Sequence, residues 1–132
     1  MSEMENNNER PTILVVDDDE LNLRLVSIFL ESYGYYIHKA ENGNEALEKL
    51  GIKKTDLVVT DFSMPNMNGL TLAGKIKGKI PIIVISGALN KEERIAFEKE
   101  GVEVFLGKPI NKDLLCEKVQ KILDKKKKQL RI

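Results

Sequence analysis

The chain has 132 residues and a mass of 14.9 kDa, a length that fits one globular domain with a substantial core. Its 21 basic and 21 acidic side chains give a net charge of zero, so overall charge favours neither nucleic acid nor an anionic membrane as a partner. One cysteine, Cys116, excludes an internal disulfide, and with the one histidine, His38, it excludes a Cys/His zinc cluster. Because the first ten residues are unlike a signal peptide and no apolar run approaches the ~20 residues of a membrane helix, we expect a cytoplasmic protein with no membrane partner.

The chain opens with a polar segment, residues 1–10, which we expect to be a disordered lead-in to a domain spanning residues 11–124. Short, nearly continuous apolar runs follow, and such runs are typical of strands in a parallel sheet that is covered on both faces. They lie at residues 12–16, 57–59, 80–85 and 102–106. The more mixed segment 35–40 predicts an edge strand.

Helical patterns lie between these runs. In the first, an i, i+4, i+7, i+8 spacing predicts a buried apolar stripe made of Leu21, Leu25, Ile28 and Phe29, with Gly34 ending the helix. Further helices are predicted at residues 44–50, between Gly69 and Gly78, from Asn90 with Glu93 at capping-box spacing, and from Asn111.

Five strands alternating with five helices predict an α/β fold, a doubly wound parallel sheet with helices on both faces. One such class, the flavodoxin-like fold, has the strand order 2-1-3-4-5 and a ligand crevice between its first and third strands. This order places the mixed segment 35–40 at an edge, as its composition suggests.

Acidic residues follow two of the predicted strands. Asp17 and Asp18 come directly after the first strand, and Asp61 ends the third. If these strands are neighbours, the three carboxylates converge and repel one another, and Mg²⁺, which prefers a few protein oxygens and keeps waters or substrate oxygens, relieves that repulsion. The simpler alternative is that an acidic run favours a helix N-terminus, the role we expect for Asp19 and Glu20.

Two more polar residues end strands at the same edge. Ser86 follows the fourth strand and Lys108 the fifth, where Pro109 comes next. Alone, a serine there is usually a turn residue and a lysine is usually solvated. Beside the acids, a hydroxyl and an ammonium are the donors that a phosphoryl group bound to Mg²⁺ requires.

Five motifs in this order resemble the receiver domain of two-component response regulators, with a likeness that covers residues 11–124. They are residues 13–18 (ILVVDD), 40–47 (AENGNEAL), 60–65 (TDFSMP) with Gly69, 81–87 (PIIVISG) and 105–109 (FLGKP). Any one motif is weak, but five at the expected strand ends are specific. The resemblance implies a stand-alone receiver similar to the chemotaxis regulators.

The resemblance also implies a role for each site residue. Asp61 accepts a phosphoryl group from a histidine kinase or a phosphotransfer protein, and Lys108 pairs with that group. The Mg²⁺ ion, for which Mn²⁺ is an alternative, is held by Asp17, Asp18, Asp61 and the backbone carbonyl of Ser63. Ser86 is the switch hydroxyl, and Phe105 is the aromatic side chain that follows it. The output surface is the face formed by the fourth helix, the fifth strand and the fifth helix.

The chain departs from the common pattern in several places. Phe105 stands where a tyrosine is frequent, Ser86 stands where threonine is commoner, and Gly87 follows where alanine is usual. The segment between Gly69 and Pro81 is short, so the third helix is expected to end near Gly74 or Gly78. Ser63 and Ala88, at positions that influence dephosphorylation in relatives, are both small.

Other functions fit less well. A receiver cut from a hybrid kinase is a close variant. A degenerate receiver that only binds partners would not need the complete set of acids, hydroxyl and lysine that this chain carries. A Mg²⁺-dependent phosphatase with an aspartyl-phosphate intermediate needs a second acid where Ser63 stands, and a flavodoxin needs a phosphate-binding loop where the acids stand. We therefore expect a phosphoacceptor rather than an enzyme.

The C-terminal segment is strongly basic. Residues 118–132 carry six lysines and Arg131 against Asp124, and residues 125–132 are expected to form a basic tail. Its simplest interpretation is a solvated helix end, and its alternative is contact with an acidic partner or a nucleic-acid backbone. Because no second domain supplies a recognition helix, sequence-specific DNA binding is not expected.

Overall fold

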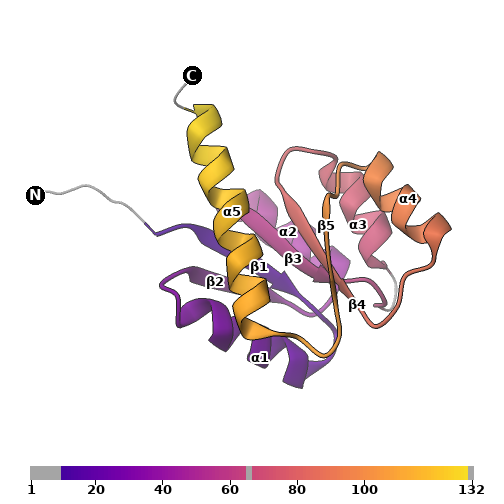
Figure 1. The fold of residues 1–132 in the computed structure, drawn as a ribbon, viewed down its shortest axis with the longest axis horizontal. Helices are drawn as coiled ribbons and strands as arrows, with labels where there is room; N and C mark the ends of the chain where they lie inside the picture. The colour runs from indigo at the N-terminus through magenta and orange to yellow at the C-terminus, as the bar shows by residue number, and fades with distance from the viewer. Residues whose placement is uncertain (1–9, 65–66, 131–132) are drawn as a thin grey trace, which may run out of the picture.

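A computed structural model describes residues 10–64 and 67–130. Five strands and five helices alternate in this part of the chain (Figure 1). The strands are β1 (Thr12–Val16), β2 (Tyr36–Ala40), β3 (Leu57–Asp61), β4 (Ile82–Ser86) and β5 (Val104–Gly107). The helices are α1 (Glu20–Glu31), α2 (Gly43–Ile52), α3 (Gly69–Ile76), α4 (Lys91–Lys99) and α5 (Lys112–Leu130). The lead-in predicted at residues 1–10 lies, apart from exposed Arg10, outside the described residues.

The strands form one parallel sheet in the order β2-β1-β3-β4-β5, which confirms the predicted fold. The strand β4 begins directly after Pro81, which has no N–H to donate but whose carbonyl accepts from the N–H of Val58 at 3.0 Å. The strands β1, β3 and β4 are buried along their whole length, whereas β2 is exposed or half-buried up to Ala40, as expected for an edge strand.

Two hydrophobic layers flank the sheet because successive strand residues point to opposite faces. In β1, Ile13 and Val15 pack beneath α1 and α5, while Leu14 and Val16 pack beneath α2, α3 and α4. All four side chains are at most 2% exposed. Figure 1 shows α1 and α5 together on one side of the sheet. Both layers stop at the strand ends, so the residues that follow the strands project beyond the core.

The apolar stripe predicted for α1 is wrong. Leu21, Leu25 and Ile28 are 74%, 41% and 52% exposed, and the buried residues are Leu23, Val26, Ser27 and Leu30. At 100° per residue these two sets lie on opposite sides of the helix, so periodicity alone could not select the buried one. Ser27 is tolerated inside because its hydroxyl donates to the carbonyl of Leu23 at 2.7 Å. Phe29, the fourth predicted residue, is half-buried against the core.

Helix ends follow the predicted signals more closely. Asn90 and Glu93 form the expected capping box of α4, and Asn111 caps α5 by accepting from the N–H of Leu114. The helix α3 is short, as expected, and ends at Ile76 because Lys77 and Gly78 both adopt positive φ.

The helix α5 continues past residue 124, where the basic tail was predicted to begin. Residues 125–130 form its last turns, and lysine is a good helix former. The Nζ atom of Lys126 also donates to the carbonyl of Asp56 at 3.4 Å, which anchors this end of the helix. Among the described residues, no helix combines the length and the apolar character needed to cross a membrane.

Candidate functional site at the carboxyl edge of the sheet

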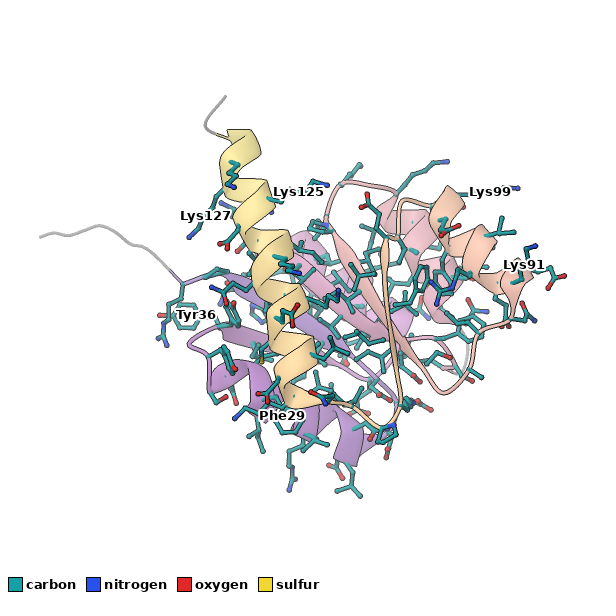
Figure 2. All side chains as sticks on the ribbon, in the orientation of Figure 1. Phe29, Tyr36, Lys91, Lys99, Lys125 and Lys127 are labelled. Atoms are coloured by element: carbon teal, nitrogen blue, oxygen red, sulfur yellow. The ribbon has the colours of Figure 1, made fainter. Side chains whose placement is uncertain are left out.

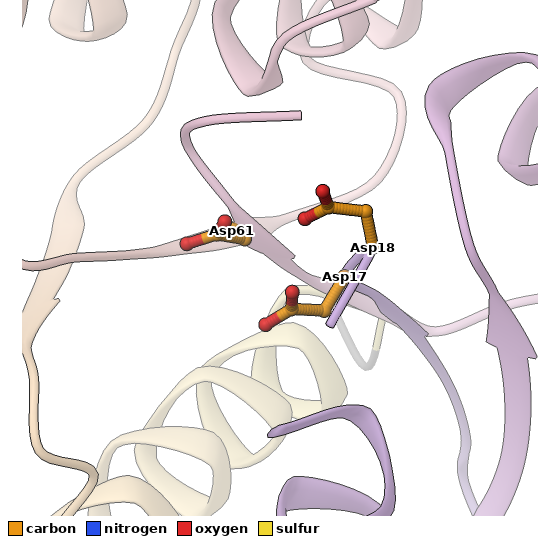
Figure 3. Close-up of side chains that lie close together, drawn as sticks. All are labelled: Asp17, Asp18 and Asp61. Atoms are coloured by element: carbon orange, nitrogen blue, oxygen red, sulfur yellow. The ribbon is translucent and has the colours of Figure 1, made fainter. Parts of the chain in front are cut away.

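Three carboxylates meet where β1 and β3 end. The register pairs Val16 with Thr60, so Asp17 and Asp18 emerge beside Asp61. One oxygen from each carboxylate can be chosen so that all three lie within 4.8 Å of one another (Figure 3). Asp17 and Asp61 are only 6% and 5% exposed, whereas Asp18 is open to solvent. The structure thus brings together the three acids that the sequence singled out.

This oxygen set fits a small divalent cation. Bonds of about 2.1 Å in octahedral geometry separate ligand oxygens by roughly 3 to 4.2 Å, a range that the three carboxylates reach with small movements. Ser63, the fourth predicted ligand through its carbonyl, lies two residues after Asp61 in the exposed part of the loop. Its role stays a prediction.

The pKa of Asp17 reflects its burial and its position among other acids. The pKa of Asp17 is raised from 3.8 to about 6, chiefly by burial and also by the neighbouring negative charges of Asp61 and Asp18. A hydrogen bond from the N–H of Asp19 at 2.9 Å and the positive charge of Lys108 act in the opposite direction. A bound cation would favour the ionised form of this carboxyl.

Lys108 reaches into the acid cluster from the end of β5. Its Nζ atom lies 2.9 Å from Oδ1 of Asp61, with the lysine side chain 32% exposed. Burial alone would lower the pKa of Lys108, but the Asp61 hydrogen bond and the charges of Asp61, Asp17 and Asp19 raise it above its usual value. The backbone N–H of Lys108 bonds the carbonyl of Ser86 at 3.2 Å, and the Lys108–Pro109 peptide is cis. The ammonium therefore stays charged beside Asp61.

Ser86 lies at the same edge but its hydroxyl is engaged elsewhere. It donates to the carbonyl of Ala88 at 3.1 Å and accepts from the N–H of Ala88 at 3.3 Å. The side chain is thus held within its own turn, and the residue is 9% exposed. A new acceptor near Asp61 would have to compete with the Ala88 carbonyl for this proton.

Phe105 lies in β5 beneath α4, in contact with two residues that sequence reasoning did not select. Its ring meets that of Phe97 edge-to-face at 5.9 Å, and Phe97 meets Phe62, the neighbour of Asp61, at 5.5 Å. The guanidinium of Arg94 lies 4.4 Å above the Phe105 ring. The i, i+3 spacing of Arg94 and Phe97 in α4 was visible in the sequence, but their shared contact with Phe105 on one face of the sheet was not.

The loop after β3 packs closely against the strand it leaves. A Cβ atom at Gly69 would lie 2.7 Å from the carbonyl oxygen of Asp61, and the N–H of Gly69 donates to the carbonyl of Phe62 at 2.8 Å. Met64 and Met67 are both 8% exposed, and Met67 fills the space above Gly43. Pro65, the last residue of the TDFSMP motif, lies outside the described residues.

The remaining candidates lie away from the acids. His38 sits in the middle of the edge strand β2, where burial and then the charges of Lys53 and Lys49 lower its pKa. Cys116 is fully buried beneath α1, with its Sγ atom 3.8 Å from the carbonyl of Phe29. Neither residue contributes to the cluster.

Comparison with known proteins gives one consistent result. A family model described as the response regulator receiver domain matches residues 13–120. The chain is 38% identical over 118 residues to chemotaxis protein CheY1 of Helicobacter pylori, covering 84% of this chain and 95% of that protein. It is also 35% identical over 115 residues, 85% of this chain, to the transcriptional regulatory protein GlrR of Escherichia coli, but spans only about a quarter of GlrR (26%).

Solved structures agree with the sequence relatives. A CheY-like response regulator receiver domain from Methanospirillum hungatei superimposes with a TM-score of 0.87 at 28% identity, covering 92% of this chain and 99% of that one. The chemotaxis protein CheY4 of Vibrio cholerae gives a TM-score of 0.83 at 27% identity, covering 87% and 100% of the two chains.

Proposed function

Because this chain belongs to the response regulator receiver domain family, we propose that Asp61 accepts a phosphoryl group from the phosphohistidine of a histidine kinase or phosphotransfer protein. The observation that carries this proposal is the placement of Asp61. Its buried carboxylate lies in a cluster of three acids with the ammonium of Lys108 at 2.9 Å. A nucleophile, a cation site and a fixed positive charge are the parts that phosphoryl transfer requires.

The reaction exchanges one bond to phosphorus for another. A carboxylate oxygen of Asp61 attacks the phosphorus, the bond from phosphorus to the histidine nitrogen breaks, and the imidazole leaves with that electron pair and takes up a proton. The product on Asp61 is an acyl phosphate. Mg²⁺, held by Asp17, Asp18, Asp61 and the Ser63 carbonyl, supplies positive charge for the transferred oxygens when bound, and Mn²⁺ fits the same ligands.

The residues of this chain then respond to the new group. Lys108 passes from the Asp61 carboxylate to a phosphoryl oxygen, because that oxygen carries more charge. The Ser86 hydroxyl leaves Ala88 and donates to another phosphoryl oxygen. Phe105 follows Ser86, which changes the face formed by α4, β5 and α5 and so alters partner binding.

The exposed apolar stripe of α1 supplies a docking surface for the phosphodonor. Leu21, Leu25 and Ile28 face solvent, and α1 begins two residues after Asp18. A stripe of this kind beside a reactive group is the pattern of a helix-against-helix interface. The donor's histidine would then approach Asp61 from the open side of the cluster, where Asp18 is exposed.

The chain itself acts as a phosphoacceptor rather than as a turnover enzyme. A phosphatase with an aspartyl-phosphate intermediate needs an acid two residues after the nucleophile, and Ser63 occupies that position. Turnover of an aryl phosphate by the purified protein, many cycles per molecule, would favour the phosphatase instead. The chemistry at Asp61 is the same whether the domain acts alone or within a larger kinase. The expected cytoplasmic location stays a prediction.

The test is the intact mass of the protein after incubation with acetyl phosphate. With Mg²⁺ we expect one addition of about 80 Da, the mass of a phosphoryl group, which is absent in Asp61→Asn and absent without the metal ion. Addition to Asp61→Asn at the wild-type rate would place the acceptor elsewhere. A Leu25→Arg/Ile28→Arg variant should keep its reaction with acetyl phosphate but lose transfer from a phosphohistidine protein, which separates the docking surface from the chemistry.

A further inference from the structure

Basic side chains gather at the edge of the sheet opposite the acid cluster. Since all strands are parallel, every segment that leads into a strand lies at this edge, and the last turns of α5 lie there as well. We define the amino edge as residues 10–11, 32–35, 53–56, 77–81, 100–103 and 125–130. It carries nine basic side chains and three acidic ones. The basic ones are Arg10, Lys53, Lys54, Lys77, Lys79 and Lys125 to Lys128, and the acids are Asp56, Glu100 and Glu103.

Hydrogen bonds join these segments into one surface. Lys126 of α5 lies 3.5 Å from Oδ1 of Asp56, and Oδ2 of Asp56 accepts from the N–H of Thr12 at 2.9 Å. The end of α5, the start of β1 and the loop that carries Lys53 and Lys54 are therefore held together. Apart from Lys126, the basic residues of the amino edge are exposed, so their charges are free to meet a partner.

A cavity of about 330 Å³ opens in this surface between α5 and the starts of β4 and β5. Lys79 and Lys125, which line it, are exposed, whereas the lining residues Ile82, Val104 and Ile122 are buried or half-buried. The cavity thus has an apolar interior and a lining of mixed charge, in which three lysines (Lys79, Lys125 and Lys126) stand beside two acids, exposed Glu103 and half-buried Glu100. Such a cavity suits a molecule that carries both a phosphate and an apolar part.

Apolar and aromatic side chains stand among the cations. Ile52, at the end of α2 directly before Lys53, is 83% exposed, the highest value among the large apolar residues whose exposure the structure describes. Tyr36, at the start of β2, is 50% exposed, and the guanidinium of Arg10 lies 4.1 Å above its ring. Exposed isoleucine and tyrosine beside lysine and arginine are typical of the boundary between a bilayer and water. The phosphate backbone of a nucleic acid provides no apolar surface against which an exposed isoleucine could pack.

The end of α5 adds a second argument for a membrane. The four consecutive lysines 125–128 follow one another by 100° around the helix. Lys126 faces the domain and contacts Asp56, and the three exposed lysines spread around the rest of the helix rather than form one basic face. Figure 2 shows Lys125 and Lys127 on these last turns, well apart from Lys91 and Lys99 on α4. A layer of lipid headgroups can contact a helix end on all of its free sides, whereas a duplex can contact one side only.

We propose that the amino edge binds the surface of an anionic phospholipid membrane. The lysines contact headgroup phosphates, the cavity between Lys79 and Lys125 receives part of one anionic lipid, and Ile52 enters the interface. The expectation of no membrane partner rested on the lack of a membrane-spanning run and on a net charge of zero. Surface binding needs no spanning run, and because the fold separates the charges, attraction to a surface depends on the local excess. In this orientation the acid cluster faces away from the membrane and stays open to a phosphodonor. The proposal does not depend on phosphorylation of Asp61.

The test is co-sedimentation with vesicles of phosphatidylcholine containing 30 mol% phosphatidylglycerol, compared with pure phosphatidylcholine. We expect binding to the anionic vesicles only, and weaker binding as salt increases. A Lys125→Gln/Lys127→Gln/Lys128→Gln variant should bind about 100-fold more weakly, since each lysine near an anionic surface contributes roughly a factor of five. An Ile52→Gln variant should lose about fivefold, because it removes apolar contact without changing charge.

Matched controls keep the outcome decisive. A Lys91→Gln/Lys99→Gln variant removes exposed lysines from α4 and should bind like the wild type. Phosphorylation by acetyl phosphate reports that each variant is folded, since none of these residues touches the acid cluster. The proposal is overturned if anionic vesicles do not bind at low salt, or if the α5 and α4 variants lose equal affinity. It is also overturned if Ile52→Gln binds undiminished, or if a DNA duplex binds while the vesicles do not.

Discussion

The two edges of the sheet carry opposite charge and different kinds of contact. At the carboxyl edge, the segments that end and follow the strands carry five acidic residues and one lysine. The acids are Asp17, Asp18, Asp19, Glu41 and Asp61, and the lysine is Lys108. At the amino edge the balance is reversed. A sequence with no net charge thus folds into a molecule with an acidic and a basic end, because a parallel sheet sorts the residues before each strand from those after it.

The contacts at the two edges also differ in what they permit. The Asp56 contacts to Lys126 and to the N–H of Thr12 join segments 70 and 44 residues apart in the sequence and hold the amino edge in place. At the carboxyl edge, the Ser86 hydroxyl bonds only within its own turn, and Lys108 is paired with Asp61, the proposed phosphoacceptor. The amino edge is therefore an anchored surface, and the carboxyl edge holds groups that can change partners.

Among substitutions that compare the two edges, the largest expected effect is on the phosphorylation rate when Lys108 of the carboxyl edge is replaced. A Lys108→Met variant leaves the Asp61 carboxylate buried without its cation, and the rate of phosphorylation by acetyl phosphate should fall about 100-fold or more. Stopped-flow or intact-mass kinetics measure this rate. Lys125→Met removes a similar charge from the amino edge and should leave the rate unchanged. Equal rates for Lys108→Met and the wild type would show that the ammonium takes no part in the transfer.

The stability of the protein should depend on pH through the carboxyl group of Asp17. Its folded pKa of about 6 lies above the 3.8 of the unfolded chain, so the folded state holds more protons between these values. Stability should therefore fall as pH rises from about 4 to 6, by up to about 3 kcal/mol, while Mg²⁺ added at pH 7 should restore part of it. Urea unfolding at several pH values checks this. Asp17→Asn should remove the fall, and a wild-type stability that rises over this range would contradict the assignment.

Two glycines test how closely each region is packed. Gly69→Ala places a methyl group 2.7 Å from the Asp61 carbonyl oxygen and should lower the free energy of unfolding by about 2 kcal/mol. Gly51→Ala, near the end of α2, meets nothing within 4 Å and should be neutral or stabilising by up to about 1 kcal/mol. Chemical denaturation measures both, and similar values for the two would mean that the loop after β3 can shift freely.

The smallest effect concerns the ion pair of the amino edge. Asp56→Asn keeps an oxygen to accept from the N–H of Thr12 but removes the charge opposite Lys126. The free energy of unfolding should therefore fall by at most about 1 kcal/mol, and this loss should be smaller at high salt. Asp56→Ala removes both contacts and should lower the free energy of unfolding by about 1 kcal/mol more than Asp56→Asn does. Equal losses in the two variants would assign the anchoring to the ion pair alone.

Local chemistry made much of the molecule predictable. Buried apolar runs predicted the strands, and their order in the chain predicted the topology. Asn90 with Glu93 predicted the capping box. The convergence of Asp17, Asp18 and Asp61 was also within reach, because residues that end neighbouring parallel strands must lie at one edge. The roles of Ser63, Ser86 and Phe105 stay predictions, although the structure places all three near that edge or beneath α4.

What the sequence left open depended on contacts between distant segments. Both sides of α1 carry apolar residues, and only packing against α5 and the sheet decided that Leu23, Val26 and Leu30 are buried while Leu21 and Ile28 are exposed. Asp17 and Asp18 are adjacent and chemically identical, yet only Asp17 is buried. The sequence alone determined which chemical groups meet at the strand ends. The tertiary structure decided which of them lose contact with water and where the cancelling charges lie, because burial and charge separation depend on neighbours that are far apart in the chain.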